Sequence, residues 1–137
     1  MCAGAQNVSP AEGRRVSPAD AAAFLRAKHE RIVAANRQRW EQARADAGRI
    51  IAHIAAQYHP RRIYQWGSVL RPERFNEMSD IDIAVEGIDS AERWFALYGD
   101  AMKMTDFPLD LVQFERIERE YRAYIIEHGK VMYERDG

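Results

Sequence analysis

Three aspartates stand at positions from which carboxylates can act together on a ligand. Asp80 and Asp82 flank one isoleucine in the segment SDIDIAV, residues 79–85. Because alternate residues of a strand point to opposite faces, these two acids share one face while the apolar residues beside them face a core. Asp110 repeats the pattern between two leucines in the segment PLDLVQF. If the two strands are neighbours in one sheet, the three carboxylates converge.

Converging carboxylates need a positive charge between them. Like charges about 4 Å apart repel by ~1 kcal/mol in water and by ~4 kcal/mol at the effective dielectric of a partly enclosed site. A divalent cation removes this repulsion, and oxygen ligands that leave coordination positions open to phosphate suit Mg²⁺ or Mn²⁺. An Asp-X-Asp pair alone is also common as a solubilising feature of an exposed strand. The third acid in the same pattern therefore favours the functional interpretation.

Gly67 and Ser68 directly follow an apolar strand segment, RIYQW. A glycine at this point lets the backbone turn sharply and lets a ligand approach closely, while the Ser68 hydroxyl and the following N–H groups can bond phosphate oxygens. Arg71 and Arg74 come shortly afterwards, and of the two Arg71 is the candidate phosphate ligand. The alternative is an ordinary strand-to-helix turn with Ser68 as N-cap and with solvated arginines.

Short strands that alternate with helices must position these groups. Segments rich in β-branched and aromatic residues and bounded by turn residues predict strands at residues 61–66, 80–87, 108–114 and 130–135. Helical periodicity and capping signals predict helices at residues 18–58, 89–105 and 116–129. Gly129 stands where a C-terminal helix stop is expected. The alternation predicts an α/β (α+β) fold with a small mixed sheet, helices packed on one face and a long N-terminal helix.

The N-terminal helix carries an apolar stripe that is weak in its first half. It is either one long helix or two helices broken between Asn36 and Gly48. The half after Trp40 is expected to cover the protein's own sheet, and the first half is a candidate contact for a partner chain or a second copy. The predicted organisation is a flexible tail, a helical segment and a sheet-bearing domain, at residues 1–17, 18–58 and 59–137.

Composition and charge narrow the class of protein. The 137 residues are 47% hydrophobic and 30% charged, with 20 basic against 21 acidic side chains and a net charge of -1. This balance is ordinary for a globular protein and argues against general nucleic-acid binding. The single cysteine, Cys2, excludes an internal disulfide and a cysteine-based metal cage. The absence of a long apolar run predicts a cytoplasmic protein that does not enter a membrane.

The combination of Gly67-Ser68, SDIDIAV and LDLV at 109–112 resembles the minimal nucleotidyltransferase (MNT) family of the DNA polymerase β-like superfamily. The segment IIEHGKVMYER, residues 125–135, is also similar to the end of such domains, where a helix runs into a closing strand. The resemblance covers about residues 50–135. It implies a small sheet of the polymerase β-like type and transfer of a nucleoside monophosphate, usually from ATP, to a hydroxyl.

The resemblance also implies roles for individual residues. Asp80 and Asp82 would hold two Mg²⁺ ions, and Asp110 would complete one metal site and favour deprotonation of the acceptor hydroxyl. Gly67 and Ser68 would cradle the triphosphate. Many family members have an arginine immediately after the Gly-Ser pair. Here that position is valine, so Arg71 is expected to take over the role.

The resemblance leaves two functions open. Small stand-alone members are often antitoxins of toxin-antitoxin systems, paired with a HEPN-domain toxin, and some attach AMP to a tyrosine of the toxin. The first hypothesis is therefore an enzyme that adenylylates a protein hydroxyl. The second is an antitoxin with a weak or inactive site that neutralises its partner by binding. Transfer to a small molecule is less favoured because the chain has little room for an acceptor domain.

Overall fold

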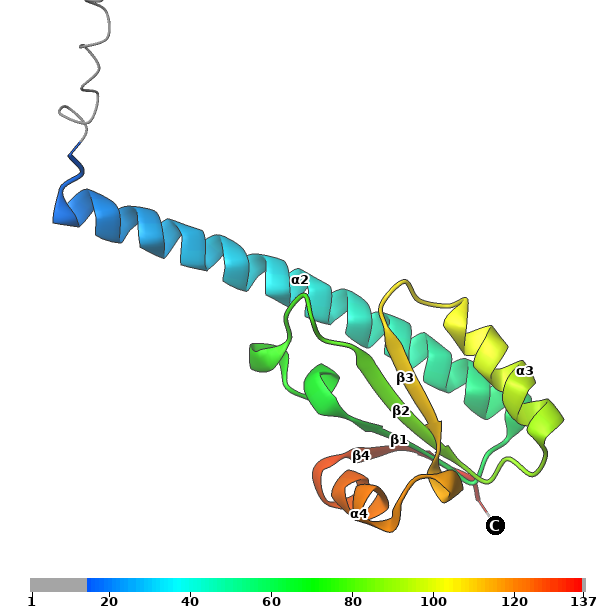
Figure 1. The fold of residues 1–137 in the computed structure, drawn as a ribbon. Helices are drawn as coiled ribbons and strands as arrows, with labels where there is room; N and C mark the ends of the chain where they lie inside the picture. The colour runs from blue at the N-terminus through cyan, green and yellow to red at the C-terminus, as the bar shows by residue number, and fades with distance from the viewer. Residues whose placement is uncertain (1–14, 137) are drawn as a thin grey trace, which may run out of the picture. The chain divides into compact units, whose positions relative to one another are not determined.

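The computed structural model describes residues 15–136 (Figure 1). Cys2 and most of the tail predicted for residues 1–17 lie outside the described residues. The chain divides into two units, Met1–Ala35 and Asn36–Gly137. Helix α2 (Pro18–Tyr58) belongs to both units and is one helix of 41 residues, without a break between Asn36 and Gly48.

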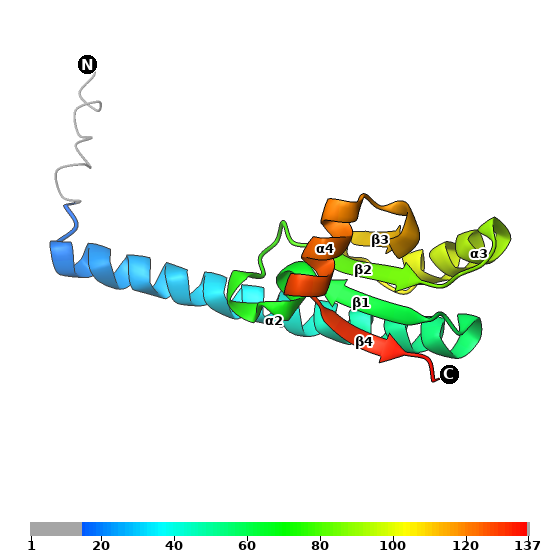
Figure 2. The same cartoon turned by 90° about the horizontal axis from the view of Figure 1, so that it is seen from below.

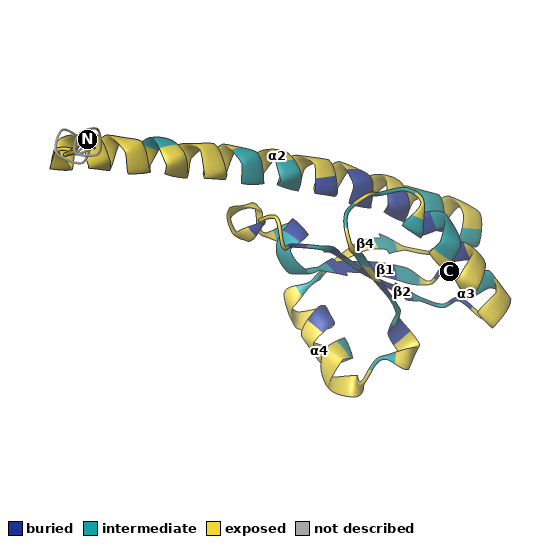
Figure 3. Ribbon diagram, turned by 45° about the horizontal axis from the view of Figure 1, so that its top comes forward, coloured by how far each residue is buried: buried dark blue, intermediate teal, exposed yellow. Residues whose placement is uncertain are grey.

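The start of α2 follows from its capping residues. Ser17 Oγ accepts a hydrogen bond from the Asp20 backbone N–H at 3.0 Å, and Pro18 occupies the first helical position, where no N–H is required. Nearly all residues of α2 before Ala35 are exposed, in keeping with the weak stripe there. The buried residues of the helix begin at Ala43 (Figure 3). No helix within residues 15–136 is both long and apolar enough to cross a membrane.

Four strands among the described residues form one mixed sheet in the order β3-β2-β1-β4. Their bounds are Arg62–Trp66 (β1), Ile81–Glu86 (β2), Leu109–Gln113 (β3) and Lys130–Glu134 (β4). Strand β1 pairs antiparallel with both β2 and β4, whereas β2 and β3 are parallel. The parallel pair requires a crossover, which helix α3 (Ala91–Met102) supplies. Figure 2 shows β1 and β2 at the centre of the sheet.

Each face of the sheet has its own apolar cluster. On one face, Ile63, Ile83 and Leu111 pack against α2 and α3 in the main core. On the other face, Tyr64 and Phe114 stack with ring centroids 4.6 Å apart. They share a second apolar cluster with Ile125 of helix α4 (Arg119–His128). The prediction of helices on one face describes α2 and α3. Helix α4 differs because Ile125 gives it an apolar contact with the opposite face.

Local signals fix the ends of α3 and α4. Ser90 caps α3, since its Oγ accepts the Arg93 N–H at 3.2 Å. Gly129 ends α4 as expected, but its φ of -95° is not left-handed. The reason for a glycine is close packing: a Cβ there would lie 2.6 Å from the Ile125 carbonyl oxygen and 2.8 Å from that of Gln65.

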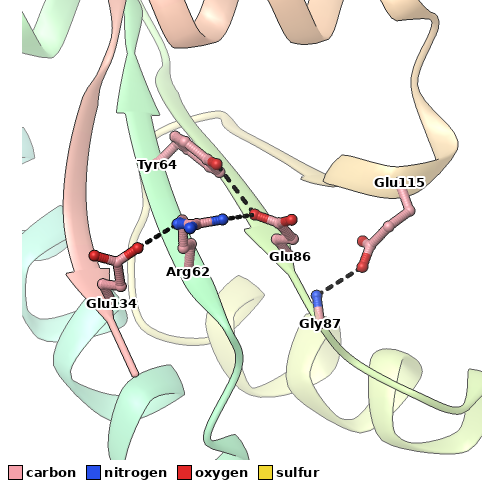
Figure 4. Close-up of polar contacts among 6 residues, drawn as sticks. All are labelled: Arg62, Tyr64, Glu86, Gly87, Glu115 and Glu134. Atoms are coloured by element: carbon pink, nitrogen blue, oxygen red, sulfur yellow. Dashed lines mark hydrogen bonds and ion pairs between the residues drawn. The ribbon is translucent and has the colours of Figure 1, made fainter. Parts of the chain in front are cut away.

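A charged cluster ties three strands together at the end of the sheet where β2 finishes (Figure 4). Arg62 on β1 donates to Glu134 on β4 and to Glu86 on β2, and the Tyr64 hydroxyl also donates to Glu86, at 3.1 Å. These ion pairs raise the pKa of Arg62 above its ordinary value. Burial, together with the hydrogen bond to Glu86, raises the pKa of Tyr64.

Candidate active site

The three predicted acids meet at the end of the sheet opposite the charged cluster. Asp82 and Asp110 are register partners in the parallel pair of β2 and β3, and Asp80 lies immediately before β2. The condition for convergence, that the two strands are neighbours in one sheet, is therefore met. Asp82 is also the register partner of Trp66, the last residue of β1, so the segment that follows β1 begins beside the acids.

A tight turn delivers Asp80 to this end of the sheet. The backbone N–H of Asn76 donates to Ser79 Oγ at 3.0 Å, and the Ser79 N–H donates back to the Asn76 carbonyl at 3.0 Å. The Asn76 side chain accepts the Met78 N–H at 2.8 Å. These reciprocal bonds are typical of Asn and Ser in turns. They fix the entry into β2 just before the first acid.

The carboxylates interact strongly. Burial, with the charges of Asp80 and Asp110, raises the pKa of Asp82 from 3.8 to about 7. Burial and the charge of Asp80 also raise the pKa of Asp110. Removal from water and mutual repulsion both disfavour the ionised form. The cluster is thus electrostatically unfavourable unless protons or cations neutralise it.

Gly67 lies directly against Asp82. Its φ is +82°, a conformation that residues with a side chain rarely adopt. A Cβ on Gly67 would lie 2.1 Å from Asp82 Oδ2. Gly67 opens a short 3₁₀ helix, η2 (Gly67–Leu70), so the backbone both turns and touches the carboxylate at this residue. The sequence predicted a sharp turn here, and the structure adds the contact with the acid.

Helix α2 holds η2 in place. The indole Nε1 of Trp40 donates to the Val69 carbonyl at 2.8 Å, and the Val69 side chain is buried in the main core. The guanidinium groups of Arg37 and Arg44 each lie over the Trp40 ring, at 5.5 and 5.4 Å from its centroid. The Gly-Ser segment is therefore anchored from one side by an aromatic residue of the long helix.

A small cavity of about 160 Å³ adjoins η2 and is rich in cationic and aromatic groups. Gly67 and Ser68 form one wall. The other lining residues are Arg71, Arg74, Tyr124 and His128. Both arginines that follow the Gly-Ser pair line the cavity, Arg71, the expected phosphate ligand, and also Arg74.

Tyr124 and His128 were not predicted as site residues. Their rings stack with centroids 4.3 Å apart, one turn from each other on α4. Their i, i+4 spacing signals a shared helix face. Only the packing of α4 beside the sheet brings that face to the Gly-Ser segment.

Metal binding was predicted for the three acids. No three acidic, histidine or cysteine side chains within residues 15–136 already stand in a metal-binding arrangement. The donor chemistry nevertheless suits Mg²⁺, because carboxylate oxygens are hard ligands and because the charges of Asp80 and Asp110 add to burial in raising the pKa of Asp82.

The part of the chain that carries these groups matches a known family model. Residues 49–137 match the model described as "Polymerase beta, Nucleotidyltransferase". No curated protein matches the chain. A solved structure described as "Crystal structure of the toxin-antitoxin with AMP-PNP" is similar with a TM-score of 0.51 and 23% sequence identity, over 63% of this chain and 72% of that chain. At this identity the similarity concerns the fold. Because the family model covers more than half of the sequence and includes all three acids and the Gly-Ser segment, the chain belongs to the polymerase β nucleotidyltransferase family.

Proposed function

We propose that this protein is a Mg²⁺-dependent nucleotidyltransferase that moves AMP from ATP to a hydroxyl group. The observation that carries the proposal is the meeting of Asp80, Asp82 and Asp110 beside a glycine turn and a cationic cavity. The acids would hold metal, and the cavity offers positive charge for phosphate. Both requirements of phosphoryl transfer thus lie at one end of the sheet.

The acceptor hydroxyl oxygen would bond the α-phosphorus of ATP while the bond from that phosphorus to the oxygen bridging it to the β-phosphate breaks, so that pyrophosphate leaves. The hydroxyl also loses its proton, which the Asp110 carboxylate would accept. Asp80, Asp82 and Asp110 would bind two Mg²⁺ ions. When bound, Mg²⁺ supplies neutralisation of phosphate charge and favours the deprotonated acceptor. Asp110 lies on the edge strand and, although partly removed from water, is the most exposed of the three acids, so it is the acid best placed to meet an incoming hydroxyl.

The cavity residues would hold and orient the triphosphate. Guanidinium groups of Arg71 and Arg74 pair with phosphate oxygens, and the Ser68 hydroxyl can donate to one. Because Gly67 has no side chain, the backbone can pass directly against the Asp82 carboxylate. The triphosphate would therefore lie between the arginines and the acids.

A protein hydroxyl is the acceptor that we favour, specifically a tyrosine of a HEPN-type toxin. The support is the similarity of fold to a structure described as a toxin-antitoxin with AMP-PNP, together with the family resemblance of the sequence. The chain would then act as the antitoxin of the pair.

A second candidate function is neutralisation of a toxin by binding alone. It is favoured by the exposed apolar side chains of α2 in the first unit, which a partner could cover. Their exposed fractions are 63% for Phe24, 61% for Leu25, 49% for Ile32 and 51% for Val33. The same surface could instead join two copies of the chain.

Intact mass spectrometry separates the two functions. The protein would be incubated with ATP and Mg²⁺, alone and with the protein encoded by the neighbouring gene. A gain of one or more AMP masses on the partner, absent with Asp82→Asn, supports transfer. A stable complex without a mass change supports binding alone. Incubation with Asp106→Asn, which alters an exposed acid outside the cluster, is the matched control and is expected to leave the mass gain intact.

A further inference from the structure

A second cavity lies where α2, η2 and β4 meet, with a volume of about 430 Å³. We call it the β4 groove. Besides the last two residues of η2, its lining residues are Trp40, Arg44, Gly48, Gln65, Lys130 and Met132. It lies on the other face of the sheet from the acids, because Gln65 is the register partner of Ile83 in the main core whereas Asp82 points the opposite way.

Gln65 gives the β4 groove an unusual wall. Its side chain is only 3% exposed, and its Nε2 is the one buried side-chain nitrogen or oxygen in residues 15–136 without a hydrogen-bond partner in the protein. Buried amide groups are almost always paired, because an unpaired donor loses its hydration without compensation. In this conformation Nε2 has almost no accessible surface, so the Gln65 side chain must turn before an acceptor atom in the groove can receive this N–H.

The charges around the β4 groove select the kind of acceptor. Arg44 and Lys130 bring two cations to it, and no acidic residue is among its lining residues. Lys130 is the register partner of Gln65, so the ammonium and the buried amide belong to adjacent strands at the same level. A carboxylate would receive a hydrogen bond from the amide and pair with the cations.

The rest of the wall is apolar. Val69, Leu70 and Met132 line the groove beside the indole of Trp40. The volume falls in the range of small-molecule sites, which combine an apolar lining with a few convergent polar groups. The combination fits an organic acid with a compact apolar or aromatic body.

We propose that the β4 groove is a binding site for a small organic carboxylate, distinct from the nucleotide site. The carboxylate oxygens accept from Gln65 Nε2 and pair with Lys130 and Arg44, and the apolar body lies against Trp40 and Met132. This proposal does not depend on nucleotidyl transfer, since it uses none of the acids and lies on the opposite face.

Heteronuclear NMR of the ¹⁵N-labelled full chain tests this site. Phenylacetate is the probe, with neutral phenylacetamide and cationic phenethylamine as charge controls. The indole N–H of Trp40 and the side-chain amide of Gln65 report on the groove, and the indole N–H of Trp94 on α3 reports on a distant surface. We expect phenylacetate to cause saturable chemical-shift changes at Trp40 and Gln65. These changes should be much weaker with phenylacetamide and absent with phenethylamine. Equal responses to all three probes, or none to phenylacetate, would overturn the proposal.

Variants then locate the binding. Gln65→Leu is expected to weaken phenylacetate binding by roughly tenfold or more, as loss of a hydrogen bond to a charged group requires. Lys130→Glu is expected to weaken phenylacetate binding to a similar extent. Because Lys130 is exposed, this variant still tests the site if Gln65→Leu does not fold. Gln113→Leu, a strand glutamine outside the groove, is the matched control.

Asp82→Asn separates this site from the nucleotide site. Phenylacetate shifts that persist in Asp82→Asn and weaken in Gln65→Leu and Lys130→Glu support the proposal, whatever the mass spectrometry shows about AMP transfer. Shifts that are unchanged in Gln65→Leu and Lys130→Glu would place the carboxylate elsewhere and refute it.

Discussion

The α-carbon of Gly67 faces the carboxylate of Asp82 so closely that a Cβ would lie 2.1 Å from Asp82 Oδ2. The contact joins the turn after β1 to an acid of β2, two elements that the register of Trp66 with Asp82 aligns. A glycine at position 67 therefore does two things at once. It adopts a φ of +82°, and it leaves the space that the carboxylate occupies.

Gly67→Ala is expected to disrupt the site and lower stability. The methyl group would displace the Asp82 carboxylate and strain the backbone, at a cost of about 1–3 kcal/mol. Thermal unfolding and Mg²⁺-ATP titration measure the two effects. Gly99→Ala is the matched control: Gly99 lies within α3 with nothing within 4 Å of its Cβ position, so this change is expected to stabilise by about 0.5–1 kcal/mol. Equal effects of the two substitutions would contradict the packing argument.

Asp82→Asn is expected to stabilise the metal-free protein and to abolish Mg²⁺-dependent ATP binding. The pKa of Asp82 is raised from 3.8 to about 7, so the wild type loses stability as pH rises from about 4 to about 7 and its carboxylate ionises. The asparagine does not titrate. The gain in unfolding free energy of Asp82→Asn over the wild type should therefore grow across that pH window and then level off. It is expected to be on the order of 1 kcal/mol, because Asp82 is only partly buried and solvent screens its charge.

Chemical unfolding in EDTA at pH 4, 6 and 8 measures this difference. A constant difference at all three pH values would show that Asp82 does not ionise against its neighbours. ATP affinity in Mg²⁺ that matches the wild type would remove Asp82 from the proposed metal site.

Asp46→Ala is expected to destabilise the fold by about 2 kcal/mol, since it removes the hydrogen bonds that a buried, charged carboxylate accepts. Asp46 is 5% exposed and accepts from Thr105 Oγ1 at 2.6 Å, from Gln42 at 2.8 Å and from Arg49. Burial would raise the pKa of Asp46, but these hydrogen bonds and the charge of Arg49 outweigh it and lower the pKa below 3.8.

A lowered carboxyl pKa contributes stability that is present above pH 3.8 and is lost as the pH falls through the folded-state pKa. Asp46→Ala should therefore differ most from the wild type at neutral pH and least in strong acid. Urea unfolding across pH 2.5–7 tests this, with the exposed Asp89→Ala as control.

Gln65→Leu is expected to raise stability by about 1 kcal/mol in the absence of ligand. The change replaces an unpaired buried amide with an apolar group of similar size. The new side chain lies on the face of the sheet that carries Ile63 and Ile83 of the main core. Thermal unfolding of the metal-free protein measures it. A destabilised variant would contradict the argument that the amide is unsatisfied within the fold.

Arg71→Gln and Arg74→Gln are expected to raise the KM for ATP by roughly tenfold each, as loss of charged hydrogen bonds to phosphate requires. Both residues line the cavity beside Gly67 and Ser68. Steady-state release of pyrophosphate measures the effect, with Arg119→Gln on the exposed start of α4 as control. An unchanged KM in both variants would remove the cavity from triphosphate binding.

The sequence alone predicted the elements and the three acids because their signals are local. Alternation of Ile81, Asp82 and Ile83 defines a strand with one polar face, and Ser17 and Ser90 mark helix starts through their own side-chain hydrogen bonds. The family resemblance was carried by the same short segments, and the family match over residues 49–137 bears it out.

Only the tertiary structure decided which distant residues meet. The parallel register sets Asp82 beside Asp110, and the packing of Ile125 against Tyr64 brings Tyr124 and His128 to the Gly-Ser segment. Such contacts depend on strand order and on the face that a helix covers, which local patterns do not encode.

Gln65 illustrates the same limit for the groove. In the sequence it is an ordinary polar residue of a short strand. Its burial follows from β1 lying between β2 and β4 under α2, and its missing partner follows from the side chains that those neighbours present. The sequence thus determined the chemistry available at each position, and the three-dimensional arrangement decided which of those groups act together.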